Sequence, residues 1–167
     1  MAELFTIKNQ IDEQRAKVEL NSRYVDEICM DIINKHTKDL DILIDAVRGI
    51  LSKDDYMITG EELESIALKI PVYLYSLCTV QEQLGIRADI SKSFEKDKYA
   101  KIARSVQGTV KEKEYIALNE TQADSVVSIV SARVYKMIQM KIEIALELLA
   151  SVKKVINKRA DELRLND

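Results

Sequence analysis

The spacing of apolar residues in the last third of the chain predicts one long amphipathic helix from Glu120 to Leu165. Neither Gly nor Pro interrupts this stretch, and at 1.5 Å per residue the helix would be about 65–70 Å long. Its apolar residues recur at alternating steps of four and three, the a and d pattern of a coiled coil: Ile138, Ile142, Ala145, Leu149, Val152 and Ile156. Because such a helix cannot cover its own stripe, we expect the remaining chain or another copy to cover it. A seam this regular favours self-association.

Helical spacing also runs through the first part of the chain. Residues 3–52 are compatible with one helix or with two, because Asn21 or Ser22 could cap a second start. The polar run from Ser52 to Asp55 is expected to end this region.

A second helical region is expected to begin at Thr59, where Thr59 and Glu62 have the spacing of a capping box. Pro71 lacks an amide hydrogen and should kink or split this helix. The apolar run over residues 72–78 is expected to be buried. Gly85 is a predicted break, since glycine readily adopts the left-handed conformation that ends helices.

Residues 86–106 then read as a shorter amphipathic segment, in which Ile86, Ile90 and Phe94 mark the apolar side. Thr109 and Glu112 form a second possible capping box. Two alternatives remain open for the last helix. It could run unbroken from residue 110, or it could start afresh at a cap made by Asn119 and Gln122.

Composition supports an all-α protein. The chain has 47% apolar and 32% charged residues, with only four Gly and one Pro, a balance that is typical of helical bundles. We therefore predict a single domain over residues 1–167: an elongated, oligomeric helical bundle with a long, coiled-coil-like C-terminal helix.

Charge is distributed unevenly along the chain. Residues 1–85 carry nine Lys and Arg against 16 Asp and Glu, a net of −7, and residues 86–167 carry 16 against 12, a net of +4. This polarity favours pairing between copies or binding of an anion by the basic half.

The sequence predicts a cytoplasmic protein that does not enter a membrane. No apolar run approaches the roughly 20 residues of a membrane span, and the first residues lack the features of a signal peptide.

Cys29 and Cys78 lie far apart in apolar surroundings without a CxxC pair. We therefore expect two buried, reduced thiols.

The sequence has few residues whose type and spacing would suit catalysis. His36, the only histidine, has Ile32 and Leu40 four residues to either side, so no ligand or catalytic partner lies at helical spacing. No phosphate-binding or dinucleotide glycine pattern occurs. We expect neither an enzyme, nor a metal site, nor a cofactor, and His36 reads as a surface residue.

Two basic clusters are the candidate binding sites. The first consists of Lys92, Lys96, Lys98, Lys101 and Arg104, interleaved with Phe94 and Tyr99. Lysines that contact phosphates and aromatic rings that stack on bases suit single-stranded nucleic acid. The second consists of Lys153, Lys154, Lys158 and Arg159, with Arg164 beyond, and no acid falls between Glu147 and Asp161. The alternatives are ordinary: an amphipathic helix with Phe94 in the core, and cations that complement the end of a helix.

The order of features over residues 85–165 resembles the UvsY-type recombination mediators of tailed phages. The resemblance rests on Leu84 to Asp89, on Gln107-Gly108-Thr109 followed by a charged helix, on Tyr135, and on the basic helix end from Val152 to Arg159. It covers about half the chain, and the acidic first half departs from the family. The resemblance implies a homo-oligomer that binds single-stranded DNA and helps a recombinase to load against a single-strand-binding protein, in the bacterial host cytoplasm. It would place DNA contact at the basic helix end.

Two functional hypotheses therefore stand. The first is a non-enzymatic, single-stranded-DNA-binding recombination mediator. The second is a structural or protein-interaction factor, such as a phage assembly scaffold or a host-defence antagonist. The two differ in an observable, because only the first should bind DNA with an affinity that falls steeply with salt.

Overall fold

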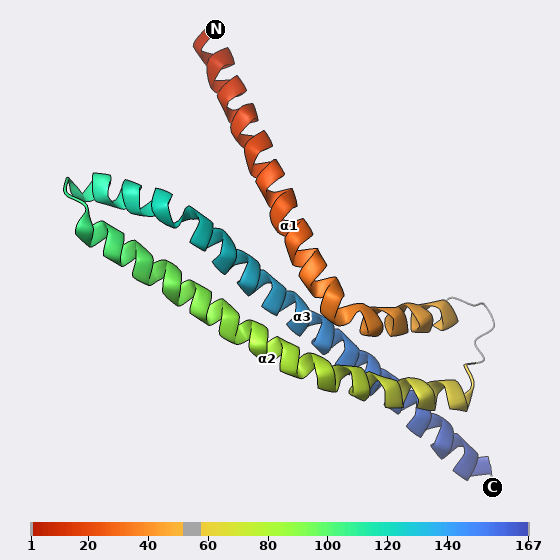
Figure 1. Ribbon diagram of the computed structural model, residues 1–167. Helices are drawn as coiled ribbons and strands as arrows, with labels where there is room; N and C mark the ends of the chain where they lie inside the picture. Colours follow the sequence, from red (N-terminus) through yellow and green to blue (C-terminus); the bar gives the residue numbers. More distant parts are fainter. Residues whose placement is uncertain (1, 52–57, 167) are drawn as a thin grey trace.

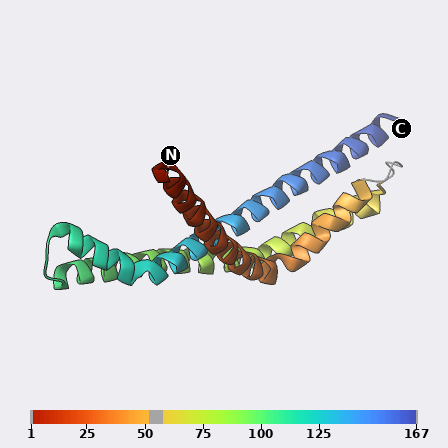
Figure 2. The same ribbon diagram turned by 90° about the horizontal axis from the view of Figure 1, so that it is seen from above.

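Three long helices make up the computed structural model, which describes residues 2–51 and 58–166 (Figure 1). They are α1 (Ala2–Leu51), α2 (Gly60–Ser105) and α3 (Val110–Asn166). Helices α2 and α3 form a long antiparallel hairpin. The C-terminal half of α1 packs on this hairpin, and the N-terminal half of α1 extends away from both helices (Figure 2). No strand occurs in the described ranges, and the predicted all-α class is confirmed.

The last helix begins at Val110, which decides between the two alternatives that the sequence left open. The Thr109 amide donates to Glu112 Oε2 at 2.8 Å, and the Glu112 amide donates back to Thr109 Oγ1 at 3.4 Å. The bond from the Thr109 amide, together with one that the Thr109 hydroxyl donates to Glu112 Oε2 at 2.8 Å, lowers the pKa of Glu112. Gly108 precedes this capping box with φ at +143°, a conformation that favours glycine. The hairpin therefore turns within a few residues, and Asn119 lies inside α3.

The start of α2 confirms the other predicted capping box. The Thr59 amide donates to Glu62 Oε2 at 2.8 Å, and the Glu62 amide donates to Thr59 Oγ1 at 3.2 Å. The helix then continues through Pro71, which does not split it. Ile70 and Leu74 are buried on either side of the proline. Their packing holds the helix together across the one backbone bond that proline cannot make.

Gly85 is not a break, and residues 86–105 are not a separate segment, because α2 runs unbroken from Gly60 to Ser105. Position 85 holds a glycine because a larger side chain would crowd a neighbouring helix. A Cβ atom at residue 85 would lie 3.1 Å from Cε2 of Tyr135 on α3. Gly85 therefore lets an aromatic ring of α3 approach the backbone of α2, a role that the sequence pattern alone does not separate from a helix end.

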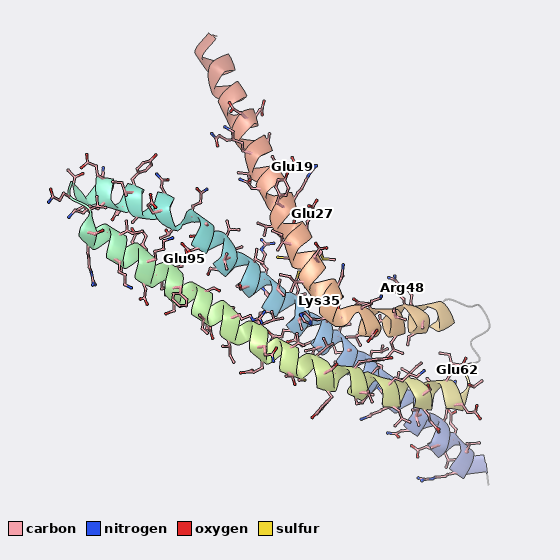
Figure 3. The ribbon with its side chains drawn as sticks, viewed as in Figure 1. Glu19, Glu27, Lys35, Arg48, Glu62 and Glu95 are labelled. Atoms are coloured by element: carbon pink, nitrogen blue, oxygen red, sulfur yellow. The ribbon has the colours of Figure 1, made fainter. Side chains whose placement is uncertain are left out.

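Helix α1 is one helix and continues without interruption through Asn21 and Ser22. It changes direction further along, near Lys35 (Figure 3). The stop signal predicted at Ser52 to Asp55 lies outside the described residues.

The regular stripe of α3 lies inside the single chain. Ile138 and Ala145 are fully buried, Ile142, Leu149 and Val152 are buried, and Ile156 is half-buried against the same cluster. Their neighbours come from all three helices; Ile33, Leu40, Leu43, Ile66, Ile70, Leu74 and Leu77 belong to the same core. Of the two alternatives that the sequence left open, cover by the remaining chain is the one seen here, because α1 and α2 cover the stripe. Its role in oligomerisation stays a prediction without support from its burial.

A polar cluster joins α1 to α3 close to the bend of α1. Thr37 is fully buried and donates to Asp41 Oδ2 at 2.7 Å. Lys141 of α3 donates to Thr37 Oγ1 at 2.9 Å and to Asp41 Oδ1 at 2.6 Å. Every polar atom of this cluster thus has a partner, as buried polar groups require. Nearby, Cys29 is buried, and Asp26 lies 3.6 Å from Arg133. The contacts hold α1 against α3 from residue 26 onward.

The N-terminal half of α1 has no such cover. Every side chain from Asp12 to Tyr24 is exposed. We call residues 12–28 the arm. An isolated helix gains little stability in water, so a partner for the arm is expected on physical grounds.

The outer side of α2 is also apolar. Leu74 and Leu77 are buried as expected for the run 72–78, but Val72 and Tyr75 are 68% and 83% exposed. Within the described ranges, α2 is one helix that is long and apolar enough to cross a membrane, with a mean hydropathy of 1.3 over 18 residues. Core helices of water-soluble proteins meet the same criterion, and the inner face of α2 packs on α3. Only 28% of this window is buried inside the structure, so α2 packs on α3 with one apolar side and leaves a second apolar side uncovered.

Candidate nucleic-acid interface

The basic end of α3 forms the freer of the two predicted clusters. The side chains of Lys153, Lys154 and Lys158 are exposed, and the helix projects past the start of α2 (Figure 1). Lys153 and Lys154 form no ion pair with a described residue. Lys158 lies 3.7 Å from Glu162, an exposed pair, and such pairs are worth little. These three lysines are available to an anion.

Arg159 has a structural task within the same cluster. It is half-buried, and its Nη1 donates to the carbonyl oxygen of Ile58 at 2.7 Å. This bond ties the end of α3 to the residue before the capping box of α2. Arg164 is exposed and lies 3.8 Å from Asp161. Arg159 is therefore the least available cation of the cluster.

The cluster on α2 is less open than the sequence predicts. Lys92, Lys96, Lys101 and Arg104 are exposed, but Lys98 pairs with Asp124 of α3 at 2.6 Å. Beside this pair, Ser125 donates to Glu95 Oε1 at 2.6 Å (Figure 3). The two contacts fasten the far part of α2 to α3. One of the five cations thus serves the hairpin.

The apolar residues of this segment do not enter the core. Ile86, Ile90 and Phe94 are 51%, 49% and 68% exposed, and of the two alternatives that the sequence left for Phe94, a core residue or an exposed ring, the structure shows the exposed ring. Leu77 is buried, and Ile86 follows it by nine residues, or two and a half helical turns, so it points to the opposite side of α2. The exposed ring of Phe94 is free to stack, and Tyr99 is half-buried.

The two clusters lie in different parts of the molecule. Lys98 meets α3 at Asp124, and Lys153 follows 29 residues later on the same helix. At 1.5 Å per residue, this separation is about 44 Å. The clusters are therefore two surfaces and not one continuous basic face.

The cysteines differ from each other. Cys29 is 2% exposed, as predicted, but Cys78 is exposed, which corrects the expectation of two buried thiols. Cys78 follows buried Leu74 by four residues and buried Leu77 by one, and the one-residue step of about 100° turns it out of the contact with α3.

We expect Cys78 to react with a thiol reagent much faster than Cys29 in the native protein, by about tenfold or more. Burial excludes the reagent from Cys29 and also raises the pKa of its thiol, which lowers the fraction of reactive thiolate. Mass spectrometry of partly labelled protein measures the two rates, and denaturation should make them similar. Equal rates in the native protein would contradict this packing.

His36 is exposed. Among residues 2–51 and 58–166, no three His, Cys, Asp or Glu side chains come together in a way that could hold a metal ion.

The sequence analysis did not predict the groove between the arm and α3. It is lined by Tyr24, Val25 and Ile28 of α1 and by Glu120, Ala123 and Val126 of α3. Tyr24 and Ile28 are 58% and 48% exposed, and Leu20, which is 54% exposed, precedes them at the same spacing of four. The sequence shows the spacing of these three residues, which indicates one side of a helix. It does not show whether another helix covers that side.

No family model, no curated protein and no solved structure matches the chain.

Proposed function

We propose that this protein is a non-enzymatic, self-associating accessory factor that binds single-stranded DNA through the end of α3 and assists the loading of a recombinase. The observation that carries the proposal is the exposure of Lys153, Lys154 and Lys158 on a stretch without acidic residues. Cations presented in this way neutralise phosphates and release counterions.

The recombinase-loading part of the proposal comes from the resemblance of residues 85–165 to UvsY-type mediators. The structure adds support of a different kind for nucleic acid. Phe94 presents an exposed ring, and the exposed cation Lys101 lies seven residues further along the same side of α2. Aromatic rings of this kind stack on unpaired bases. The α2 cluster is therefore a second, weaker candidate for contact with the same strand.

Binding of a fluorescent single-stranded oligonucleotide, followed by anisotropy while salt is raised, tests the proposal. Three phosphate contacts should give a slope of log affinity against log salt of about −2, because each contributes roughly 0.7 for a single strand. Sequence preference should be weak, since charge and stacking do not read base edges. Absence of binding at low salt would remove the proposal.

A protein-interaction or scaffolding role is the second candidate. It is favoured by the uncovered apolar side chains on the arm and on the outer side of α2, where Val18, Tyr75 and Phe94 are each more than half exposed. Exposed apolar stripes of this extent mark contact surfaces. This role would remain if the protein ignored DNA at every salt concentration.

A further inference from the structure

A cavity lies at the end of the molecule where α1 stops and α2 begins (Figure 1). Its volume is about 160 Å³. All three helices contribute to its floor, which consists of four buried aliphatic side chains: Val47 of α1, Leu63 and Ile66 of α2, and Val152 of α3. A molecule that enters this cavity would therefore contact the whole bundle at once.

The wall of the cavity is apolar. Apart from Ser151 and Arg159, every described residue that lines it is aliphatic. The Ser151 hydroxyl donates to the Glu147 carbonyl oxygen at 2.9 Å, so its proton is used within α3. Water needs two to four polar partners, which such a wall does not supply, whereas an apolar cavity of about 150 Å³ binds benzene. The cavity therefore suits an apolar group of about six carbon atoms.

One cation stands at the rim of this cavity. Arg159 is half-buried and lies on the same side of α3 as Val152 and Val155, at steps of seven and four residues. Its Nη1 donates to the carbonyl oxygen of Ile58, another lining residue, at 2.7 Å. No described carboxylate pairs with Arg159, and a guanidinium has five N–H donors. Its planar group matches the two oxygens of a carboxylate.

We propose that this cavity binds a short aliphatic carboxylate, whose tail packs on the apolar floor and whose head group accepts hydrogen bonds from Arg159. Charge complementarity selects the head group, and the size of the apolar cavity selects the tail. The bond to the Ile58 carbonyl orients the guanidinium in advance, which lowers the entropy lost on binding. The site is separate from the proposed contact with DNA, which uses the exposed lysines of α3, and it does not depend on that contact.

Hexanoate is the probe, and hexan-1-ol and hexylamine are the matched ligands with the same six-carbon chain. The full chain, with labelled methyl groups in Ile, Leu and Val, is titrated and followed by NMR. Hexanoate should bind with a dissociation constant of about 1 mM, since burial of roughly five CH₂ and CH₃ groups supplies that affinity. Hexan-1-ol should bind about tenfold more weakly, and hexylamine more weakly still, because neither complements a cation.

The same spectra locate the ligand. The methyl signals of Val47, Ile66 and Val152 should shift together, because these side chains come from three helices but meet on one floor. The signals of Ile86 and Ile90, which are exposed on another part of α2, should stay in place.

Variants of Arg159 separate its charge from its bond to Ile58. Arg159→Gln removes the charge but keeps an amide donor for the carbonyl oxygen. It should weaken hexanoate binding by about tenfold and change hexan-1-ol binding by no more than about twofold. Arg159→Lys should keep the preference for hexanoate. Lys136→Gln removes one charge from an exposed position of α3 and should affect neither ligand.

Val155→Phe places a larger side chain at the rim, where Val155 is 43% exposed, and should weaken hexanoate and hexan-1-ol alike. Ile144→Phe is its control, because Ile144 is 57% exposed on α3 and does not line the cavity. The comparison of the three ligands needs only the wild type, so it decides the matter even if Arg159→Gln unfolds. Cavity signals that do not shift at about 20 mM hexanoate, shifts scattered over all helices, equal affinity for the three ligands, or a folded Arg159→Gln that binds hexanoate as the wild type does would each overturn the proposal.

Discussion

Replacing Ile138 with aspartate is expected to abolish cooperative folding of the single chain. Ile138 is fully buried, and its core neighbours come from α1 and α2 as well as from α3. A carboxylate placed there loses its hydration and finds no prepared partner, which costs several kcal/mol. A domain of this kind is stable by only about 5–15 kcal/mol in total. Thermal unfolding followed by circular dichroism should show a lost or strongly lowered transition.

Ile144→Asp is the matched control for this prediction. Ile144 lies six residues further along the same helix and is 57% exposed, so the same substitution should change stability little. Ile138→Ala should fall between the two, with a loss of about 2–5 kcal/mol from the cavity that it creates. An Ile138→Asp protein that folds normally but no longer associates would show that the stripe faces another copy and that the packing described here is wrong.

Reversing the exposed lysines at the end of α3 is expected to remove binding to single-stranded DNA. In the variant Lys153→Glu, Lys154→Glu, Lys158→Glu, three phosphate contacts are lost and replaced by repulsion. Removing three contacts should reduce the salt slope by about 2. Helicity should change little, because the three exposed side chains lie at least two turns before the end of α3, outside the last turn where cations stabilise a helix. Arg159 is left unchanged, since its bond to the Ile58 carbonyl supports the fold.

The comparison variant is Lys92→Glu, Lys96→Glu, Lys101→Glu on α2, which makes the same change of charge on the other basic surface. If this variant loses binding and the α3 variant keeps it, DNA binding stands but its site is on α2. If both variants bind as the wild type does, neither cluster is the interface. Anisotropy at a fixed low salt concentration, repeated at two higher ones, separates these results.

Local signals in the sequence identified both capping boxes as candidate helix starts, with Asn119 and Gln122 left as an alternative start for the last helix. Both capping boxes, at Thr59 and at Thr109, depend on residues only three positions apart. The bonds form within one turn, so no distant part of the chain decides them. The same holds for the all-α class, because helical spacing with few Gly and one Pro leaves little room for strands.

Positions whose role depends on a distant partner could not be read in this way. Gly85 has the appearance of a helix end, and only the ring of Tyr135 across the hairpin explains it. Lys98 and Arg159 look like free cations, but Asp124 and the Ile58 carbonyl engage them. Each partner is 26 or more residues away or on another helix.

The sequence by itself determined that this chain forms long amphipathic helices, that the second region begins at Thr59, and that its positive charge gathers in two clusters. Those properties follow from neighbours within a few residues. Only the tertiary structure decided which apolar side of each helix is covered. Periodicity shows that a side exists, but α2 has two such sides, and burial goes to the one where Leu74 and Leu77 meet α3. The stripe of α3 is covered within one chain, whereas the arm and the side of α2 that carries Ile86, Ile90 and Phe94 remain uncovered. Three helices of these lengths cannot shield every apolar side that they carry.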